Sequence, residues 1–199
     1  MNYIHITKEN IDKEHICCAM SGKQSLVKKE WLRQRFDEGL VFYRSEERGM
    51  IRGHQFNKVE MVQYAHPARS AEAFEELVKK ASSLVEKLGL HYRVSKLAAG
   101  DCSASMKRTY DIEIWIPSMG IYKEVSSVSN AGDYQARRNN TRYRDSRTGK
   151  PAYVHTLNGS GLATSRVFPA LIEQYQNEDG SVTVPEVLRP FMGGLEVIR

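Results

Sequence analysis

Apolar residues recur at helical spacing over residues 70–88, on one side of a segment whose other side is charged. Ser70 favours an N-cap position and Gly89 favours a helix stop, so we expect a helix between them. A helix with a single apolar face packs that face against another element, here a sheet. The apolar positions are Ala71, Phe74, Leu77, Val78, Ala81, Leu84, Val85 and Leu88.

Alternation of apolar and polar residues predicts several strands, because side chains of a strand point to opposite faces in turn. The pattern indicates strands at residues 40–43, 52–61, 90–97 and 152–157, and a short helix at 28–39. Residues 110–117 and 121–129 flank a Ser-Met-Gly turn and are expected to form an antiparallel hairpin. Hairpins with helices between them favour an α+β fold, an antiparallel β-sheet with flanking helices.

Small residues run directly into an arginine at the start of a second predicted helix, within residues 155–176. Gly159, Ser160 and Gly161 permit close approach of a ligand to the backbone, and Arg166 would add a cation beside amides that already favour anions. This arrangement suits a polyphosphate, although on pattern alone a solvated arginine is the commoner outcome. Pro169 departs from the pattern. Proline inside a helix costs about 3 kcal/mol, so the helix is expected to begin later or to bend there.

Composition adds few restrictions to this fold. A chain of 199 residues with 41% hydrophobic residues suits one domain with a substantial core. Three cysteines without metal-ligand spacing predict a reducing, cytoplasmic setting with neither disulfide nor structural zinc, and no stretch is long and apolar enough for a membrane. The net charge of +5 permits a polyanionic partner without requiring one.

Basic and aromatic residues interleave over residues 133–145. This pattern is compatible with nucleic-acid binding. A mixed role, structural salt bridges together with a contribution to a positive cleft, is the favoured interpretation.

The string from Asn158 to Pro190 resembles motif 3 of class II aminoacyl-tRNA synthetases, in the form found in seryl-tRNA synthetases. Residues 52–61 are similar to motif 2 of the same family, and Tyr43-Arg44-Ser45-Glu46 looks like its opening. The resemblance covers roughly residues 50–199. It implies a class II synthetase-like catalytic core that is incomplete at its N-terminal side.

The resemblance also implies site residues. Arg44, Arg52 and Arg166 would contact the phosphates of ATP, with Arg52 and Arg166 as the catalytic pair. Glu46 would meet the adenine end and Phe56 would stack on the purine. Glu60, Asn158 and Ser160 would bind serine, and Glu124 and Ser127 would hold Mg²⁺, for which carboxylate and hydroxyl oxygens are suitable ligands.

The function implied is a serine–tRNA ligase: activation of L-serine with ATP to seryl-adenylate, followed by transfer to tRNA(Ser), with ATP and Mg²⁺ as cofactors. The alternative is a catalytically degenerate synthetase paralogue that binds a nucleotide or a partner. No heptad run predicts the tRNA-gripping coiled-coil arm, the loop after Glu46 is short, and homodimer formation stays open. Residues 1–49 instead resemble the start of a GCN5-related N-acetyltransferase, so we divide the chain into 1–49 and a partial synthetase domain at 50–199.

Overall fold

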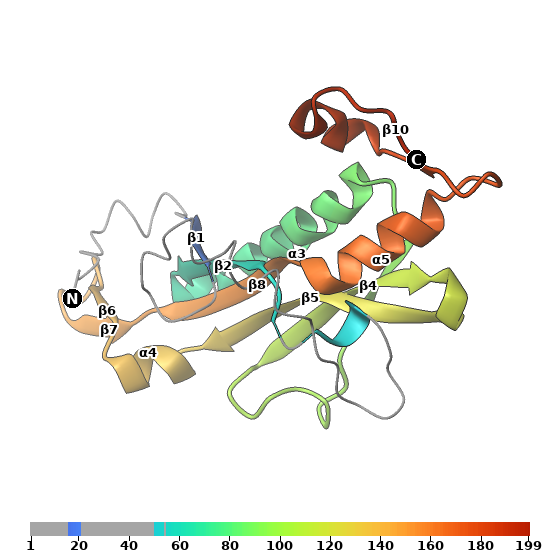
Figure 1. Cartoon of the computed structure of the whole chain (residues 1–199). Helices are drawn as coiled ribbons and strands as arrows, with labels where there is room; N and C mark the ends of the chain where they lie inside the picture. Colours follow the sequence, from blue (N-terminus) through green and yellow to red (C-terminus); the bar gives the residue numbers. More distant parts are fainter. Residues whose placement is uncertain (1–15, 21–49, 54) are drawn as a thin grey trace.

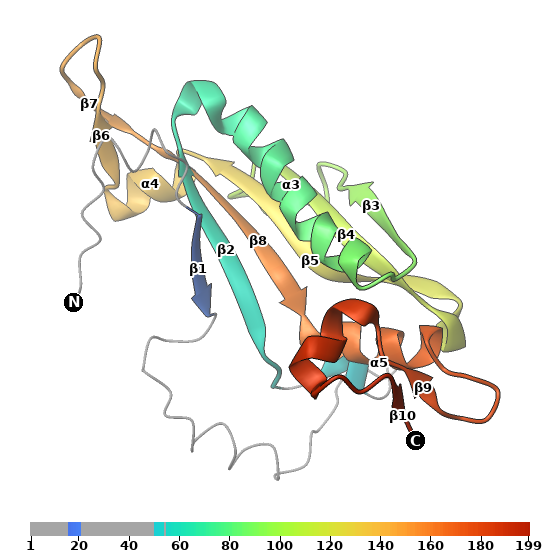
Figure 2. The same cartoon turned by 90° about the horizontal axis from the view of Figure 1, so that it is seen from above.

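A six-stranded antiparallel sheet forms the centre of the protein in the computed structural model, which describes residues 16–20, 50–53 and 55–199 (Figure 1). Its order is β1-β2-β8-β5-β4-β3, so β8 lies between two strands that precede it in the chain (Figure 2). The predicted α+β class is confirmed. The strands are β1 (Ile16–Met20), β2 (Lys58–Ala65), β3 (Tyr92–Lys96), β4 (Arg108–Ile116), β5 (Ile121–Gly132) and β8 (His155–Ala163).

Two helices, α3 (Ser70–Lys87) and α5 (Thr164–Gln174), pack on the same face of the sheet (Figure 1). The core between them and the strands includes Phe74, Leu77, Ile112 and Ile114, all of which are fully buried. Every second residue of β4 therefore points into this core, as the alternation of isoleucines in the sequence predicted.

The N-cap predicted at Ser70 is wrong. A 3-10 turn, η2 (Pro67–Arg69), precedes α3, and the capping position is Arg69, which makes no capping hydrogen bond through its side chain. The Ser70 hydroxyl instead lies 2.7 Å from Nδ1 of His155 on β8. The Ser70 hydroxyl, which the local sequence predicts as a helix cap, thus contacts a distant strand instead. The predicted stop is correct, because Gly89 follows α3 with φ of +67°.

The strand predicted at 52–61 is wrong in its first half. Residues 50–52 form the 3-10 turn η1 (Met50–Arg52), and β2 starts at Lys58. Both η1 and the residue before β2 bond to the start of α5: Nε of Arg166 donates to the Ile51 carbonyl at 3.4 Å, and the Thr164 hydroxyl donates to the Asn57 carbonyl at 2.6 Å. These side-chain contacts replace a strand ladder there.

The strand predicted at 152–157 divides into β7 (Pro151–Tyr153) and β8, and β8 continues through the small residues to Ala163. Gly159 lies in the strand, where an added Cβ would stand 3.1 Å from Val128 on β5. Glycine is therefore needed for close strand packing rather than for a loop. The second helix begins at Thr164 in spite of Pro169, which lies inside it, so a late start is excluded.

The predicted hairpin of β4 and β5 is confirmed, with η3 (Pro117–Met119) and Gly120 in its turn. A register shift interrupts it: Glu113 pairs with Glu124, whereas Ile112 pairs with Ser126 and Asp111 with Ser127. One extra residue, Val125, thus forms a β-bulge. Because of this bulge, Glu124 and Ser127 face the same side of the sheet although they are three residues apart.

A smaller unit continues from the end of β5 and returns to β8. It comprises α4 (Tyr134–Asn139), β6 (Arg142–Arg144) and β7, and β6 pairs with β7. Buried Ala136 and Val154 form its own small core. We call residues 133–153 the basic unit. It lies at one end of the sheet (Figure 2).

The chain ends in the β9 (Val182–Thr183) and β10 (Val197–Ile198) pair around η4 (Glu186–Met192). None of the helices in the described ranges is long and apolar enough to span a membrane. The helix predicted at 28–39, the strand at 40–43, and the site residues Arg44 and Glu46 lie outside the described residues.

Candidate active site

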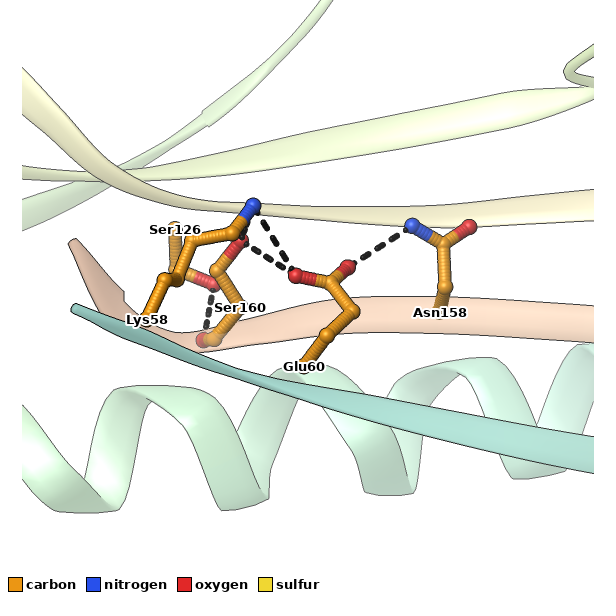
Figure 3. Close-up of polar contacts among 5 residues, drawn as sticks. All are labelled: Lys58, Glu60, Ser126, Asn158 and Ser160. Carbon is orange, nitrogen blue, oxygen red and sulfur yellow. Dashed lines mark hydrogen bonds and ion pairs between the residues drawn. The ribbon is translucent and has the colours of Figure 1, made fainter. Parts of the chain in front are cut away.

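The carboxylate of Glu60 is the centre of a hydrogen-bonded network on the sheet face that α3 does not cover (Figure 3). Asn158 donates its side-chain amide to one Glu60 oxygen at 3.0 Å, and the Ser160 hydroxyl donates to the other at 2.9 Å. The Lys58 ammonium lies 3.0 Å from that second oxygen and donates to the Ser160 hydroxyl at 3.1 Å. With 16% exposure, the Glu60 side chain is a charge in a largely desolvated setting.

The strands explain why these side chains meet. Glu60 on β2 pairs with Ser160 on β8, and Asn158 is two residues from Ser160, so all three share one face. Lys58 and Glu60 are likewise two residues apart. On the other side of β8, the Ser126 hydroxyl donates to the Ser160 carbonyl at 2.7 Å and ties β5 to the network.

Arg166 connects three elements: α5, β5 and η1. From the first turn of α5, one guanidinium nitrogen donates to the Glu124 carbonyl at 2.6 Å and lies 3.7 Å from the Glu124 carboxylate. Its Nε donates to the carbonyl of Ile51, the neighbour of Arg52 in η1. Arg166 is only 19% exposed. Arg166 therefore ties η1 and Glu124 of β5 to the start of α5.

An open cavity of about 340 Å³ adjoins the start of α5 and is largely apolar. Phe56 lines it and is 44% exposed, which leaves its ring available to a flat partner. Thr164 and Ser165 at the start of α5 form another wall. The full lining is Met50, Gly53, Gln55, Phe56, Asn57, Thr164, Ser165 and Phe168.

The side chains of Glu124 and Ser127 offer hard oxygen donors on one face. Ser127 stands opposite Asp111, and its hydroxyl donates to the Asp111 carboxylate. Burial raises the pKa of Asp111, the Ser127 hydrogen bond lowers it, and Glu124 and Glu113 raise it further, whereas Arg166 lowers it. The Oδ1 atom of Asp111 is buried without a hydrogen-bond partner.

This donor set fits Mg²⁺, which binds one or two protein oxygens and completes its shell with water and phosphate. Within the described residues, no group of three histidine, cysteine, aspartate or glutamate side chains is arranged to hold a metal.

Three of the residues predicted for the site, Glu60, Asn158 and Ser160, form one network. Arg166 contacts Glu124, with which Ser127 shares a face, and Phe56 lines the cavity at the start of α5. Arg52 belongs to η1, whose Ile51 carbonyl bonds to Arg166, and Arg44 and Glu46 lie outside the described residues.

Two other residues contact these side chains but were not predicted from the sequence: Lys58, beside Glu60, and Asp111, beside Ser127. Lys58 could have been found, because it precedes Glu60 by two residues in a predicted strand. Asp111 could not, because its position opposite Ser127 depends on the bulge.

A six-stranded antiparallel sheet that has helices on one face and a polar, arginine-lined site at the start of α5 is the architecture of class II aminoacyl-tRNA synthetases. The chain belongs to the tRNA synthetase class II core domain family (G, H, P, S and T), whose profile matches residues 11–175.

Within this family, the similar proteins are serine–tRNA ligases. Serine–tRNA ligase 2 of Clostridium acetobutylicum is 68% identical over 151 residues, which make up 76% of this chain and 36% of that protein. The serine–tRNA ligase of Nitratidesulfovibrio vulgaris is 56% identical over 156 residues, 78% of this chain and 37% of the relative. This chain thus spans about a third of the length of these relatives.

Two solved structures share the fold. Seryl-tRNA synthetase from Pyrococcus horikoshii, complexed with ATP, has a TM-score of 0.74 at 42% identity and covers 78% of this chain and 34% of its own. Serine–tRNA ligase from Naegleria fowleri, in complex with AMP, has a TM-score of 0.72 at 27% identity and covers 98% of this chain and 54% of its own.

Proposed function

We propose that the chain is a seryl-tRNA synthetase catalytic core, which activates L-serine with ATP and transfers the seryl group to tRNA(Ser). The observation that carries the proposal is the Glu60 network, in which an amide, a hydroxyl and an ammonium converge on one carboxylate. The serine–tRNA ligase relatives and the ATP and AMP complexes of the two similar structures support it. The division of the chain at residue 49 stays a prediction.

Serine recognition would rest on the Glu60 network. A carboxylate that already accepts an ammonium from Lys58 at 3.0 Å has suitable chemistry for the ammonium of an amino acid. Asn158 and Ser160 would meet the serine hydroxyl. Because serine is small, selection against alanine must depend on that hydroxyl, whose absence would leave buried polar groups unpaired.

Activation would proceed by attack of a serine carboxylate oxygen on the α-phosphorus of ATP. A new oxygen–phosphorus bond forms, the bond from the α-phosphorus to the bridging oxygen breaks, and pyrophosphate leaves with that electron pair. Arg52 and Arg166 would hold the phosphates in line and offset their charge. Phe56 would give the adenine a flat apolar surface.

Glu124 and Ser127 would hold Mg²⁺ beside these arginines. When bound, the ion would supply charge neutralisation on the phosphate oxygens. Asp111 accepts a hydrogen bond from the Ser127 hydroxyl, so the lone pairs of the Ser127 oxygen are directed away from Asp111. Arg44 and Glu46 remain predicted contacts of ATP.

Serine-dependent exchange of pyrophosphate into ATP tests the proposal. The wild-type chain should exchange with serine and not with alanine. Glu60→Gln should lower kcat/KM for serine by about 10- to 100-fold, because a hydrogen bond to a charged group contributes about 1.5–3 kcal/mol. The dissociation constant for ATP should stay unchanged.

Glu178→Gln provides the matched control, since Glu178 is exposed in the turn after α5. ATP binding without exchange in the wild type would instead select the degenerate paralogue. Loss of exchange in both variants alike would show that the Glu60 network has no special role.

A further inference from the structure

The basic unit, residues 133–153, concentrates the positive charge of the chain. It contains six arginine and lysine residues against two aspartates, a net charge of +4, while the whole chain carries +5. All six cationic side chains are exposed. They are Arg137, Arg138, Arg142, Arg144, Arg147 and Lys150.

Most of these cations have no carboxylate partner within residues 16–20, 50–53 and 55–199. Arg137 forms an ion pair with Asp133 at 2.7 Å. Among the described residues no other cation of the unit is within ion-pair distance of a carboxylate. The carboxylate of Asp145 is used by the turn, where it accepts the backbone amides of Arg147 and Thr148 at 2.9 Å.

Neutral partners hold several of these guanidinium groups in place. Arg138 lies over the Tyr134 ring, 3.3 Å from its centroid, and Arg144 donates to the Gly149 carbonyl at 2.8 Å. Arg142 lies over the Tyr153 ring at 4.8 Å and also donates to its hydroxyl. These contacts orient the guanidinium groups but leave their charge in place. Less side-chain entropy is therefore lost when the groups bind a ligand.

The unit is attached to the end of the face that carries the site. On α4, the Gln135 side chain accepts a hydrogen bond of 2.6 Å from the Thr156 hydroxyl. Thr156 is two residues before Asn158 on β8, so both side chains lie on the same face. His66 Nε2 and the Tyr143 hydroxyl, 3.0 Å apart, fix β6 to the segment after β2.

We propose that the basic unit binds the phosphate backbone of the RNA substrate and positions it at the end of the site face. The proposal rests on the proposed function, because it assumes that tRNA is the polyanion delivered to this site. Fixed, exposed guanidinium groups are well suited to phosphate oxygens. The contact would be independent of the RNA sequence, because phosphate oxygens are the same at every nucleotide.

Binding of a tRNA(Ser) transcript to the full 199-residue chain, followed by fluorescence anisotropy between 50 and 200 mM salt, tests this surface. Arg147→Gln/Lys150→Gln is the main variant, because the backbone amides of these residues, which the substitutions keep, form the hydrogen bonds of the turn. At 0.1 M salt, counterion release predicts roughly tenfold weaker binding for each phosphate that the variant no longer neutralises. The slope of log K against log salt should fall by about 0.7–0.9 for each such phosphate.

Lys79→Gln/Lys80→Gln is the matched control. It removes the same charge from the exposed side of α3, on the opposite face of the sheet, and should leave the affinity within about twofold, because charges on the far face are screened from the RNA. Arg138→Gln/Arg142→Gln should reproduce the weaker binding from the other side of the basic unit. Both basic-unit variants should retain wild-type serine-dependent pyrophosphate exchange, which uses no RNA.

The inference is overturned if the control pair weakens binding as much as the basic-unit pairs, or if all variants bind the transcript as the wild type does. Normal exchange with unchanged RNA affinity would refute the RNA surface alone. Absent exchange in the wild type would refute the proposed function, whatever the RNA affinity. Binding of an acidic protein but no RNA would identify the unit as a protein interface and reject the proposal.

Discussion

At the scale of single residues, the site depends on a carboxylate whose two oxygens have separate partners. Asn158 occupies one oxygen of Glu60, while Ser160 and Lys58 share the other. Such a carboxylate has little freedom to rotate. Sequence motifs could place Glu60, Asn158 and Ser160 in one site, because their order along the chain matched a known pattern. The role of Lys58 required knowledge of which face its side chain shares.

Phe56 allows a direct test of nucleotide recognition. Phe56→Ala should weaken ATP binding by about 1–3 kcal/mol, the usual contribution of an aromatic ring stacked on a base, while KM for serine changes little. Isothermal titration with ATP would measure this. Phe191→Ala is the matched control, because Phe191 is 84% exposed in η4 and should leave affinity unchanged. Equal affinities for wild type and Phe56→Ala would remove Phe56 from the adenine site.

At the scale of elements, the β-bulge in β5 decides which side chains can meet. The alternation of isoleucines was sufficient to predict the hairpin of β4 and β5. A hairpin with uniform register would place Ser126 opposite Asp111 and would leave Glu124 and Ser127 on opposite faces. The single extra residue places Ser127 there instead. The alternation of apolar and polar residues could not predict the pairing of Ser127 with Asp111, because a bulge changes the register without changing the composition of the strand.

The end of α3 provides a prediction with a built-in control. Gly89→Ala should destabilise the fold by about 2–3 kcal/mol, because φ of +67° disfavours a side chain and the new Cβ would stand 2.3 Å from the Tyr175 hydroxyl. Gly149→Ala has the same φ but nothing within 4 Å, so it should cost only about 1–2 kcal/mol. Urea unfolding of both variants measures the difference. Equal losses of stability would mean that the Tyr175 hydroxyl contributes nothing to the effect.

At the scale of the whole molecule, the two faces of the sheet have different tasks, and sequence could predict only part of this division. The apolar positions of α3 and β4 identified the packed face. Strand order was not predictable from alternation, since β8 is inserted between β2 and β5 only in three dimensions. The strand predicted at 52–61 begins only at Lys58, because the Asn57 carbonyl before it is bonded by Thr164 of α5, more than a hundred residues later.

Overall stability should depend on pH through His155, which joins β8 to α3. Burial lowers the pKa of His155, and so do Lys107 and, more weakly, His66, whereas Asp133 opposes them. The unfolded chain, with a histidine pKa of about 6.5, therefore binds this proton more readily than the folded chain. The stabilisation is fully present above about pH 6.5 and is lost as pH falls through the lowered value.

His155→Gln keeps a polar partner for Ser70 but cannot take up this proton. The variant should lose less unfolding free energy than the wild type between pH 7.5 and 5, as measured by urea titration at several pH values. An identical decline in both proteins would assign the acid sensitivity to other groups.

The insertion of β8 between two earlier strands also has a consequence for biosynthesis. While the ribosome is still translating residues up to about 154, the edge of β2 that β8 will cover remains open, and Glu60 has neither Asn158 nor Ser160 beside it. The Glu60 network therefore forms in one step, when β8 enters the gap between β2 and β5. Until then, the nascent chain exposes two unpaired strand edges, the kind of surface that chaperones shield from aggregation.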